Sequence, residues 1–141
     1  MGRHTYEIFA GHWPTVTDTD GLADRMNSMT KYVVSDSLTE AHWNNTTIIS
    51  RADFPARARE LRQQPGQNII QYGYGPVTAS LLRAGLLDEL RIWLHPLLVG
   101  GQGLDALLAG VGADATKLRL ADVKAYDSGM VILSYQPELT E

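Results

Sequence analysis

Segments typical of strands alternate with segments typical of helices along this chain, and this alternation limits the fold more than any other feature. Strand-like runs lie at residues 31–35 and 47–49, and the Ala-, Arg- and Leu-rich residues 54–63 predict a helix. Repeated strand–helix units are typical of α/β proteins with a substantially parallel sheet. We therefore expect a mixed, mostly parallel sheet flanked by helices.

The second half of the chain continues this pattern and ends differently. Residues 68–72 predict a further strand, residues 77–84 a helix, and residues 89–96 another strand. Residues 118–135 then predict an antiparallel hairpin, because two β-rich runs flank a glycine-containing turn at residues 127–129. The expected architecture is thus an α/β sheet closed by a C-terminal antiparallel hairpin.

Length and composition narrow the classes of protein that fit. The 141 residues predict a single domain over residues 1–137 with a short tail at residues 138–141. Cysteine is absent, which excludes disulfides and thiolate metal sites, and the four histidines lack metal-ligand spacing. A net charge of −4 argues against nucleic acid as a partner. No apolar run reaches the roughly 18 residues of a membrane span, so we expect a cytoplasmic protein without a membrane partner.

The first candidate site is the Gly-Arg-x-Thr segment at the start of the chain. Gly2 lets the backbone approach an anion, Arg3 offers a bidentate guanidinium, and Thr5 adds a hydroxyl beside the first N–H groups of a helix. These groups together suit phosphate. The alternative is an ordinary surface helix with an incidental arginine.

Two further segments follow predicted strands. The turn Gly73-Tyr74-Gly75-Pro76 leads from a strand into a helix, where backbone N–H groups and the helix dipole favour a dinucleotide pyrophosphate. Ser35 opens a Ser-Asp-Ser turn whose hydroxyls suit a ribose or a ribose phosphate. The alternatives are a tight turn without a ligand in the first case and a solvated turn in the second.

Other enzyme classes find no support in the sequence. A Gly-x-Ser-x-Gly nucleophile elbow and a Gly-Lys-Ser/Thr phosphate loop are both missing. No residue stands out as a proton donor, so the catalytic residues are not predicted.

Several landmarks, taken in order, are more specific than any single motif. They are Gly-Arg-His-Thr-Tyr-Glu at residues 2–7, Lys-Tyr-Val-Val-Ser at 31–35, Ile-Ile-Gln-Tyr-Gly-Tyr-Gly at 69–75, Gly-Leu-Leu-Asp-Glu-Leu-Arg at 85–91, His-Pro-Leu-Leu-Val-Gly-Gly at 95–101, and the C-terminal hairpin. This order resembles the dihydrofolate reductase-like family. Within it, the chain is most similar to the branch of the C-terminal reductase domain of the bifunctional riboflavin-biosynthesis deaminase-reductase.

The resemblance implies a fold, an activity and a cofactor. Members of the family use NADPH to reduce a pteridine- or pyrimidine-like small molecule, and members of this branch commonly form homodimers. By position, the resemblance assigns cofactor phosphates to Gly2, Arg3 and Thr5, the adenosine side to Ser35, and the pyrophosphate and adjoining ribose to Gly73, Tyr74, Gly75, Pro76 and Val77. No metal is implied.

The chain departs from the family pattern in two places. Family members have a strand, a loop and a helix before the Gly-Arg-x-Thr segment, so we expect an N-terminally truncated domain. A non-catalytic nucleotide-binding or oligomerisation module is therefore the alternative function. Asp36 stands where many relatives have a basic or neutral residue, and its carboxylate would repel a ribose phosphate. NADH is for this reason an alternative cofactor.

Overall fold

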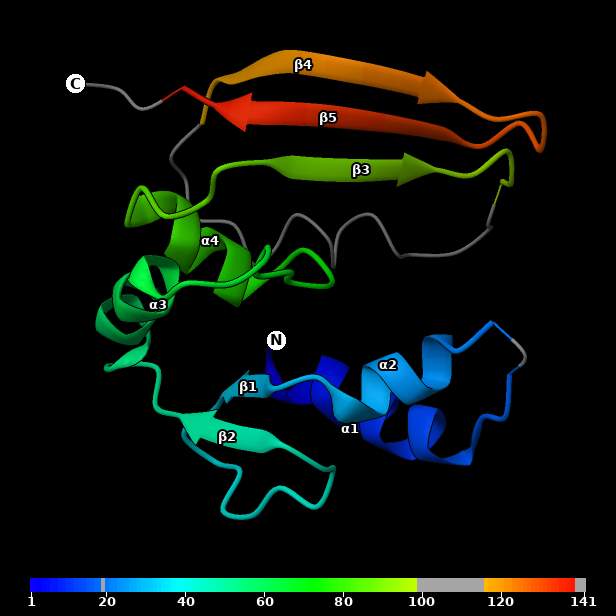
Figure 1. Ribbon diagram of the computed structural model, residues 1–141. Coiled ribbons are helices and arrows are strands. Elements are labelled where there is room, and N and C mark those ends of the chain that lie inside the picture. Colours follow the sequence, from blue (N-terminus) through cyan, green and yellow to red (C-terminus); the bar gives the residue numbers. More distant parts are fainter. Residues whose placement is uncertain (19, 99–115, 139–141) are drawn as a thin grey trace. The chain divides into compact units, whose positions relative to one another are not determined.

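The computed structural model describes residues 1–18, 20–98 and 116–138, and the chain divides into two compact units, Met1–Val77 and Thr78–Glu141. Each unit has its own sheet (Figure 1). In the first unit the elements are α1 (Arg3–His12), the 3-10 helix η1 (Trp13–Thr15), α2 (Leu22–Ser28), β1 (Lys31–Val34), β2 (Thr46–Ile49) and α3 (Phe54–Gln63). Then follow α4 (Pro76–Arg83), which begins at the boundary, β3 (Leu90–Leu94), β4 (Leu118–Ala125) and β5 (Val131–Pro137).

The first unit is built on a short parallel pair of strands. β1 and β2 run parallel, with Val34 opposite Ile49 at their carboxyl ends. The start of the chain lies beside β1, because Gly2 forms a parallel bridge with Val34 and the Val34 N–H donates to the Met1 carbonyl at 2.9 Å. The Met1 amine donates to the carbonyl of Tyr32, and burial lowers the pKa of this amine. Three parallel segments, namely the start of the chain, β1 and β2, therefore end at the same edge of this sheet.

The core of the first unit is aromatic. Tyr6, Met26, Val33 and Trp43 form a buried cluster, in which Trp43 is only 4% exposed. The Trp43 backbone N–H donates to the Tyr6 hydroxyl at 3.1 Å, and the indole N–H donates to Asn27 Oδ1 at 2.7 Å. Since these contacts join α1, α2 and the loop between the two strands, the cluster fixes α1 relative to β1.

A buried lysine closes the end of α2. Lys31 Nζ donates to the carbonyls of Met26 at 3.0 Å, Asn27 at 3.0 Å and Met29 at 2.7 Å. The same ammonium lies 4.3 Å from the centroid of the Trp43 ring. Burial lowers the pKa of Lys31, while the three carbonyls and the ring satisfy the ammonium charge. Lys31 is thus a helix C-cap supplied by a strand.

The second unit contains a three-stranded antiparallel sheet in the order β3-β5-β4. β5 lies in the middle, with Leu90 opposite Tyr135 on one side and Ala125 opposite Val131 on the other. A register shift between Leu120 and Asp122 marks a bulge in β4. The strands have large apolar side chains that remain exposed, namely Ile92, Trp93, Leu94, Leu120 and Val123.

Most predicted elements are confirmed, and the sheet is corrected in two respects. The predicted helices at residues 54–63 and 77–84 correspond to α3 and α4, and the predicted hairpin to β4 and β5. The expectation of one mostly parallel sheet is wrong for the described residues, which form a two-stranded parallel and a three-stranded antiparallel sheet. Residues 68–72 are not a strand, because no described strand forms a hydrogen-bond ladder with them.

The prediction of a single domain over residues 1–137 stays a prediction. Within residues 1–18, 20–98 and 116–138, no helix is both long enough and apolar enough to cross a membrane.

Candidate functional site

The candidate site lies in the first unit, at the edge where the three parallel segments end. After Gly2 the chain enters α1, after Val34 it forms the turn at residues 35–38, and after Ile49 it leads toward α3. The carboxyl ends of parallel strands meet at one sheet edge, so polar residues that follow them are brought together. Every residue predicted to contact the cofactor belongs to this unit.

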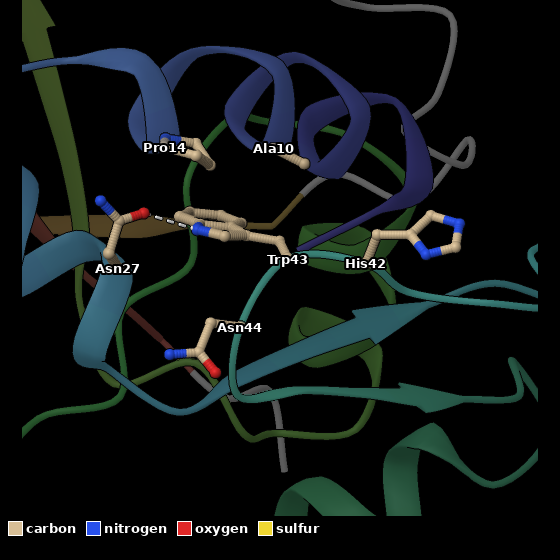
Figure 2. A pocket seen from close by; sticks show the side chains of 6 residues that line it. All are labelled: Ala10, Pro14, Asn27, His42, Trp43 and Asn44. Atoms are coloured by element: carbon tan, nitrogen blue, oxygen red, sulfur yellow. Dashed lines mark hydrogen bonds between the residues drawn. The ribbon is translucent and has the colours of Figure 1, made fainter.

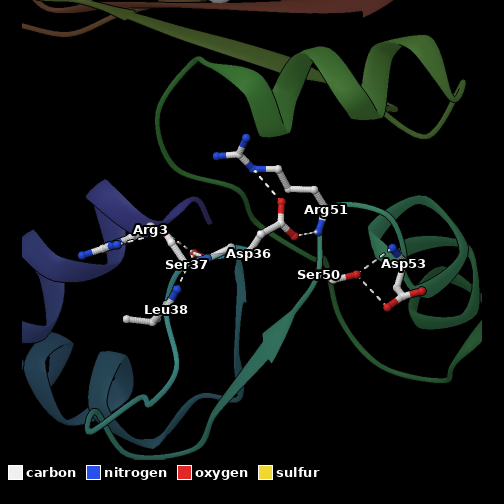
Figure 3. A network of polar contacts seen from close by, with 8 residues as sticks. Arg3, Asp36, Ser37, Leu38, Ser50, Arg51 and Asp53 are labelled. Atoms are coloured by element: carbon white, nitrogen blue, oxygen red, sulfur yellow. Dashed lines mark hydrogen bonds and ion pairs between the residues drawn. The ribbon is translucent and has the colours of Figure 1, made fainter.

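The N-terminus of α1 provides donors for an anion. Gly2 is the N-cap residue in an extended conformation, and no side chain caps the helix. No acidic residue lies in the first turn, so the positive end of the helix dipole is not offset there. Arg3 donates through Nε to Glu7 Oε1 at 2.6 Å and through Nη1 to Ser37 Oγ at 2.9 Å. Its guanidinium is thereby held beside the turn that follows β1 (Figure 3).

The glycine turn before α4 approaches the start of α1. Gly73 has φ of 81°, a left-handed conformation that favours glycine, and a Cβ placed on it would lie 3.7 Å from Thr5 Oγ1. The ring of Tyr72 packs against the ring of Phe9 on α1, with their centroids 5.5 Å apart. Two segments about 70 residues apart in sequence, both predicted to contact phosphate, are thus adjacent in the structure.

The remaining residues of this turn continue from Gly73. Tyr74 and Gly75 are half-buried, and Pro76 is the exposed first residue of α4. Val77 is buried, and a Cβ placed on Gly2 would lie 3.6 Å from its Cγ2 atom. The structure therefore places Val77 beside the start of the chain, as the phosphate-binding prediction requires. The contacts of all these residues with a cofactor stay a prediction.

Ser35 has a clear role in its own turn. The residue is 5% exposed, and its Oγ accepts hydrogen bonds from the N–H groups of Ser37 at 3.2 Å and Leu38 at 3.0 Å. Ser35 Oγ also lies 3.5 Å from Ser37 Oγ, so the hydroxyl is engaged within its own turn. The turn role was the alternative to an adenosine contact, and the contact itself stays a prediction.

Arg51 belongs to this edge and was not predicted from the sequence. Its backbone N–H donates to Asp36 Oδ1 at 2.8 Å, and its Nε lies 3.5 Å from Asp36 Oδ2 (Figure 3). Ser50 and Asp53 form a separate pair, with Ser50 Oγ donating to Asp53 Oδ2 at 2.6 Å. The only signal for Arg51 is its place two residues after β2, which matches the place of Asp36 two residues after β1.

A hollow of about 430 Å³ lies elsewhere on the same unit, and Figure 2 shows six of its lining residues. Trp43 crosses this hollow, flanked by Asn27, Asn44 and His42. The Trp43 indole N–H is already donated to Asn27, and the Asn27 amide donates in turn to the Trp13 carbonyl at 3.1 Å. These groups support the aromatic core, so we assign the hollow no chemistry.

Comparison with known proteins matches most of this chain to one family. The RibD C-terminal domain family matches residues 1–132. The uncharacterized protein YyaP of Bacillus subtilis (strain 168) is 26% identical over 137 residues, which make up 95% of this chain and 70% of that protein.

Two solved structures are similar to the chain. One is the "Putative riboflavin biosynthesis protein" from Shewanella sp. PV-4, with a TM-score of 0.64 and 16% identity, covering 99% of this chain and 72% of that one. The other is a pyrimidine reductase-like protein from Corynebacterium diphtheriae, with a TM-score of 0.48 and 14% identity, covering 84% of this chain and 53% of that one. The first similarity shows a shared fold.

Proposed function

Because this chain belongs to the RibD C-terminal domain family, we propose that it is a reductase that uses NADPH to reduce a pteridine- or pyrimidine-like small molecule. The family supports a reductase-like role, and the first unit supports the binding of a dinucleotide. When bound, the reduced nicotinamide supplies the hydride, whereas the protein supplies binding and orientation.

The residues at the start of α1 would hold the phosphates of the cofactor. The first-turn N–H groups and the dipole of α1 favour an anion, and Arg3 adds a fixed positive charge beside them. Thr5 Oγ1 lies against the turn at Gly73, which has no side chain. A phosphate bound at the start of α1 would meet the Thr5 hydroxyl and the first-turn N–H groups.

The observation that carries the proposal is the approach of Gly73 to Thr5. A side chain at Gly73 would be in contact with Thr5 Oγ1, and the left-handed backbone also disfavours one. A glycine in this conformation lets the backbone of the turn lie against the start of α1 with no side chain between them.

Titration of NADPH, followed by its fluorescence, tests the proposal. Replacing Arg3 with Ala removes a charge-assisted contact, so we expect affinity to fall about 10- to 100-fold. Arg57→Ala is the matched control, since Arg57 also forms a helical ion pair, to Glu60 at 2.7 Å. The proposal fails if wild type does not bind NADPH or if the two variants bind it equally well.

A turnover assay separates the proposed enzyme from its alternative. A reductase consumes NADPH when pteridines or pyrimidines are supplied, and Arg3→Ala lowers that rate with the affinity. NADPH binding without any hydride transfer across such a panel would instead support a non-catalytic nucleotide-binding module.

A further inference from the structure

We infer that one face of the antiparallel sheet in the second unit is the surface through which two copies of this chain associate around a two-fold axis. The sheet consists of β3, β5 and β4 in that order (Figure 1). The inference does not rest on the proposed reductase function, because the residues proposed to bind the cofactor belong to the first unit.

The strand register sorts the side chains of this sheet into two faces. Side chains alternate between the faces along each strand, and residues directly opposite each other on paired strands share a face. One face therefore consists of three rows across β3, β5 and β4, namely Leu90, Tyr135 and Leu120, then Ile92, Leu133 and Val123, then Leu94, Val131 and Ala125. None of these residues carries a charge, and we call this surface the apolar face.

The bulge in β4 keeps the apolar face continuous. Leu120 and Val123 are three residues apart, so a regular strand would place them on opposite faces. The register shift between Leu120 and Asp122 inserts one residue and returns Val123 to the face of Leu120. The same shift places Asp122 on the other face, opposite Ser134.

The other face of the sheet is mixed. Arg91, Asp122 and Lys124 lie on this face, together with Trp93 and Ile132. An antiparallel sheet with one apolar and one polar face ordinarily packs the apolar face on a core and leaves the polar face to water. The sequence of these three strands therefore predicts a partner for the apolar face.

The described residues of the second unit do not supply that partner. Val123 and Leu120, on the edge strand β4, are 50% and 49% exposed, and Ile92 on β3 is 42% exposed. A contiguous exposed apolar surface is typical of an interaction site, whereas single exposed apolar residues are ordinary.

A second copy of the chain fits this surface. In a two-fold contact the same surface meets itself, so it must be complementary to its own image. The apolar face meets this condition because it has no charge that would lie against a like charge. Two sheets pack face to face about 10 Å apart with their strands nearly aligned, as in a β-sandwich.

The size of the apolar face agrees with a weak dimer. Its side chains offer roughly 500 Å² per copy, so that two copies bury about 1,000 Å², which is the lower limit for a specific interface. We therefore expect association that depends on protein concentration, with monomer and dimer in exchange.

Two neighbouring residues of β3 provide a matched test. Leu94 and Trp93 are 58% and 59% exposed, but only Leu94 belongs to the apolar face. Leu94→Lys places an unpaired charge in the interface, so we expect the dissociation constant of the dimer to rise about tenfold or more. Val123→Lys makes the same change from β4. For Trp93→Lys we expect a change of less than about threefold, because that residue remains in water.

Sedimentation equilibrium of the full chain at micromolar to millimolar concentrations measures the association, and far-UV circular dichroism shows whether each variant is folded. Wild type and Trp93→Lys are expected to approach twice the 15.5 kDa mass of one chain, whereas Leu94→Lys and Val123→Lys remain near the monomer mass. If Leu94→Lys does not fold, Val123→Lys decides the comparison.

Two outcomes would overturn the inference. A wild type that stays monomeric over this concentration range would show that no second copy covers the apolar face. A dimer that Leu94→Lys and Val123→Lys weaken no more than Trp93→Lys does would show that the copies associate through another surface.

Discussion

The two units of this chain are stabilised in different ways. The described residues of the first unit form two short strands, and this unit buries an aromatic cluster in which Trp43 is 4% exposed. The second unit has longer antiparallel strands, yet Trp93 on β3 is 59% exposed. An antiparallel hydrogen-bond ladder therefore does not by itself bury side chains. The candidate site belongs to the unit whose segments are fixed by a buried core. A phosphate-binding site needs this, because its residues must be held in position by packing.

Replacing one tryptophan in each unit gives the strongest test of this difference in burial. Trp43→Ala removes a buried ring, its hydrogen bond to Asn27 and its contact with Lys31, so we expect a loss of about 3–5 kcal/mol in the free energy of unfolding. Trp93→Ala removes a ring that is mostly exposed, and we expect less than about 1 kcal/mol. Urea unfolding followed by far-UV circular dichroism measures both. Equal losses would show that the sheet of the second unit is covered in solution.

Replacing one lysine in each unit tests the same difference, with a smaller expected loss of stability. Lys31 Nζ lies over Trp43 and donates to three carbonyls. Lys124, on the exposed strand β4, has its Nζ 4.9 Å from the ring centroid of Tyr126. Lys31→Met keeps the volume and loses the cap of α2, so we expect a cost of about 2–3 kcal/mol.

For Lys124→Met we expect less than about 1 kcal/mol, because an exposed cation–π contact contributes little. Thermal unfolding of both variants tests this order. If Lys124→Met costs as much as Lys31→Met, the hydrogen bonds to the end of α2 do not account for the stability of the first unit.

Two glycines with positive φ give the smallest effect. Gly129 closes the hairpin with φ of 83°, and a Cβ there would lie 3.1 Å from Pro96 Cγ. Gly129→Ala and Gly73→Ala are each expected to cost about 1–2 kcal/mol, because alanine disfavours the left-handed region. Only Gly73→Ala is expected to weaken NADPH binding as well, since only Gly73 borders the proposed phosphate site. A parallel loss of affinity in Gly129→Ala would contradict that assignment.

Local signals in the sequence were sufficient for most elements. α3 begins at Phe54 with a proline in its first turn and ends before Pro65, so its predicted bounds agree with the structure. α4 ends at Arg83, and Gly85, two residues later, has a φ of 64°, the left-handed conformation expected of glycine after a helix. The strand predicted at residues 68–72 was wrong because strand formation depends on a partner. Residue composition carries no information about that partner.

The site was predictable only in part, for the same reason. Gly2, Arg3, Thr5 and Gly73 were chosen from short motifs, and the structure brings them together. Arg51 belongs to no motif. Its contact with Asp36 depends on the parallel register of β1 and β2, which is a relation between segments 15 residues apart. Pairing of this kind becomes visible only when the strands are placed.

The hydroxyl of Ser35, which accepts from two backbone N–H groups of its own turn, has a consequence for the thermodynamics of binding. The turn at the edge of the site is ordered by internal bonds before any ligand arrives. Association there would lose little backbone conformational entropy, because that entropy was already lost on folding. A change at Ser35 would thus weaken binding through a more disordered free state, even if the bound state were unaltered.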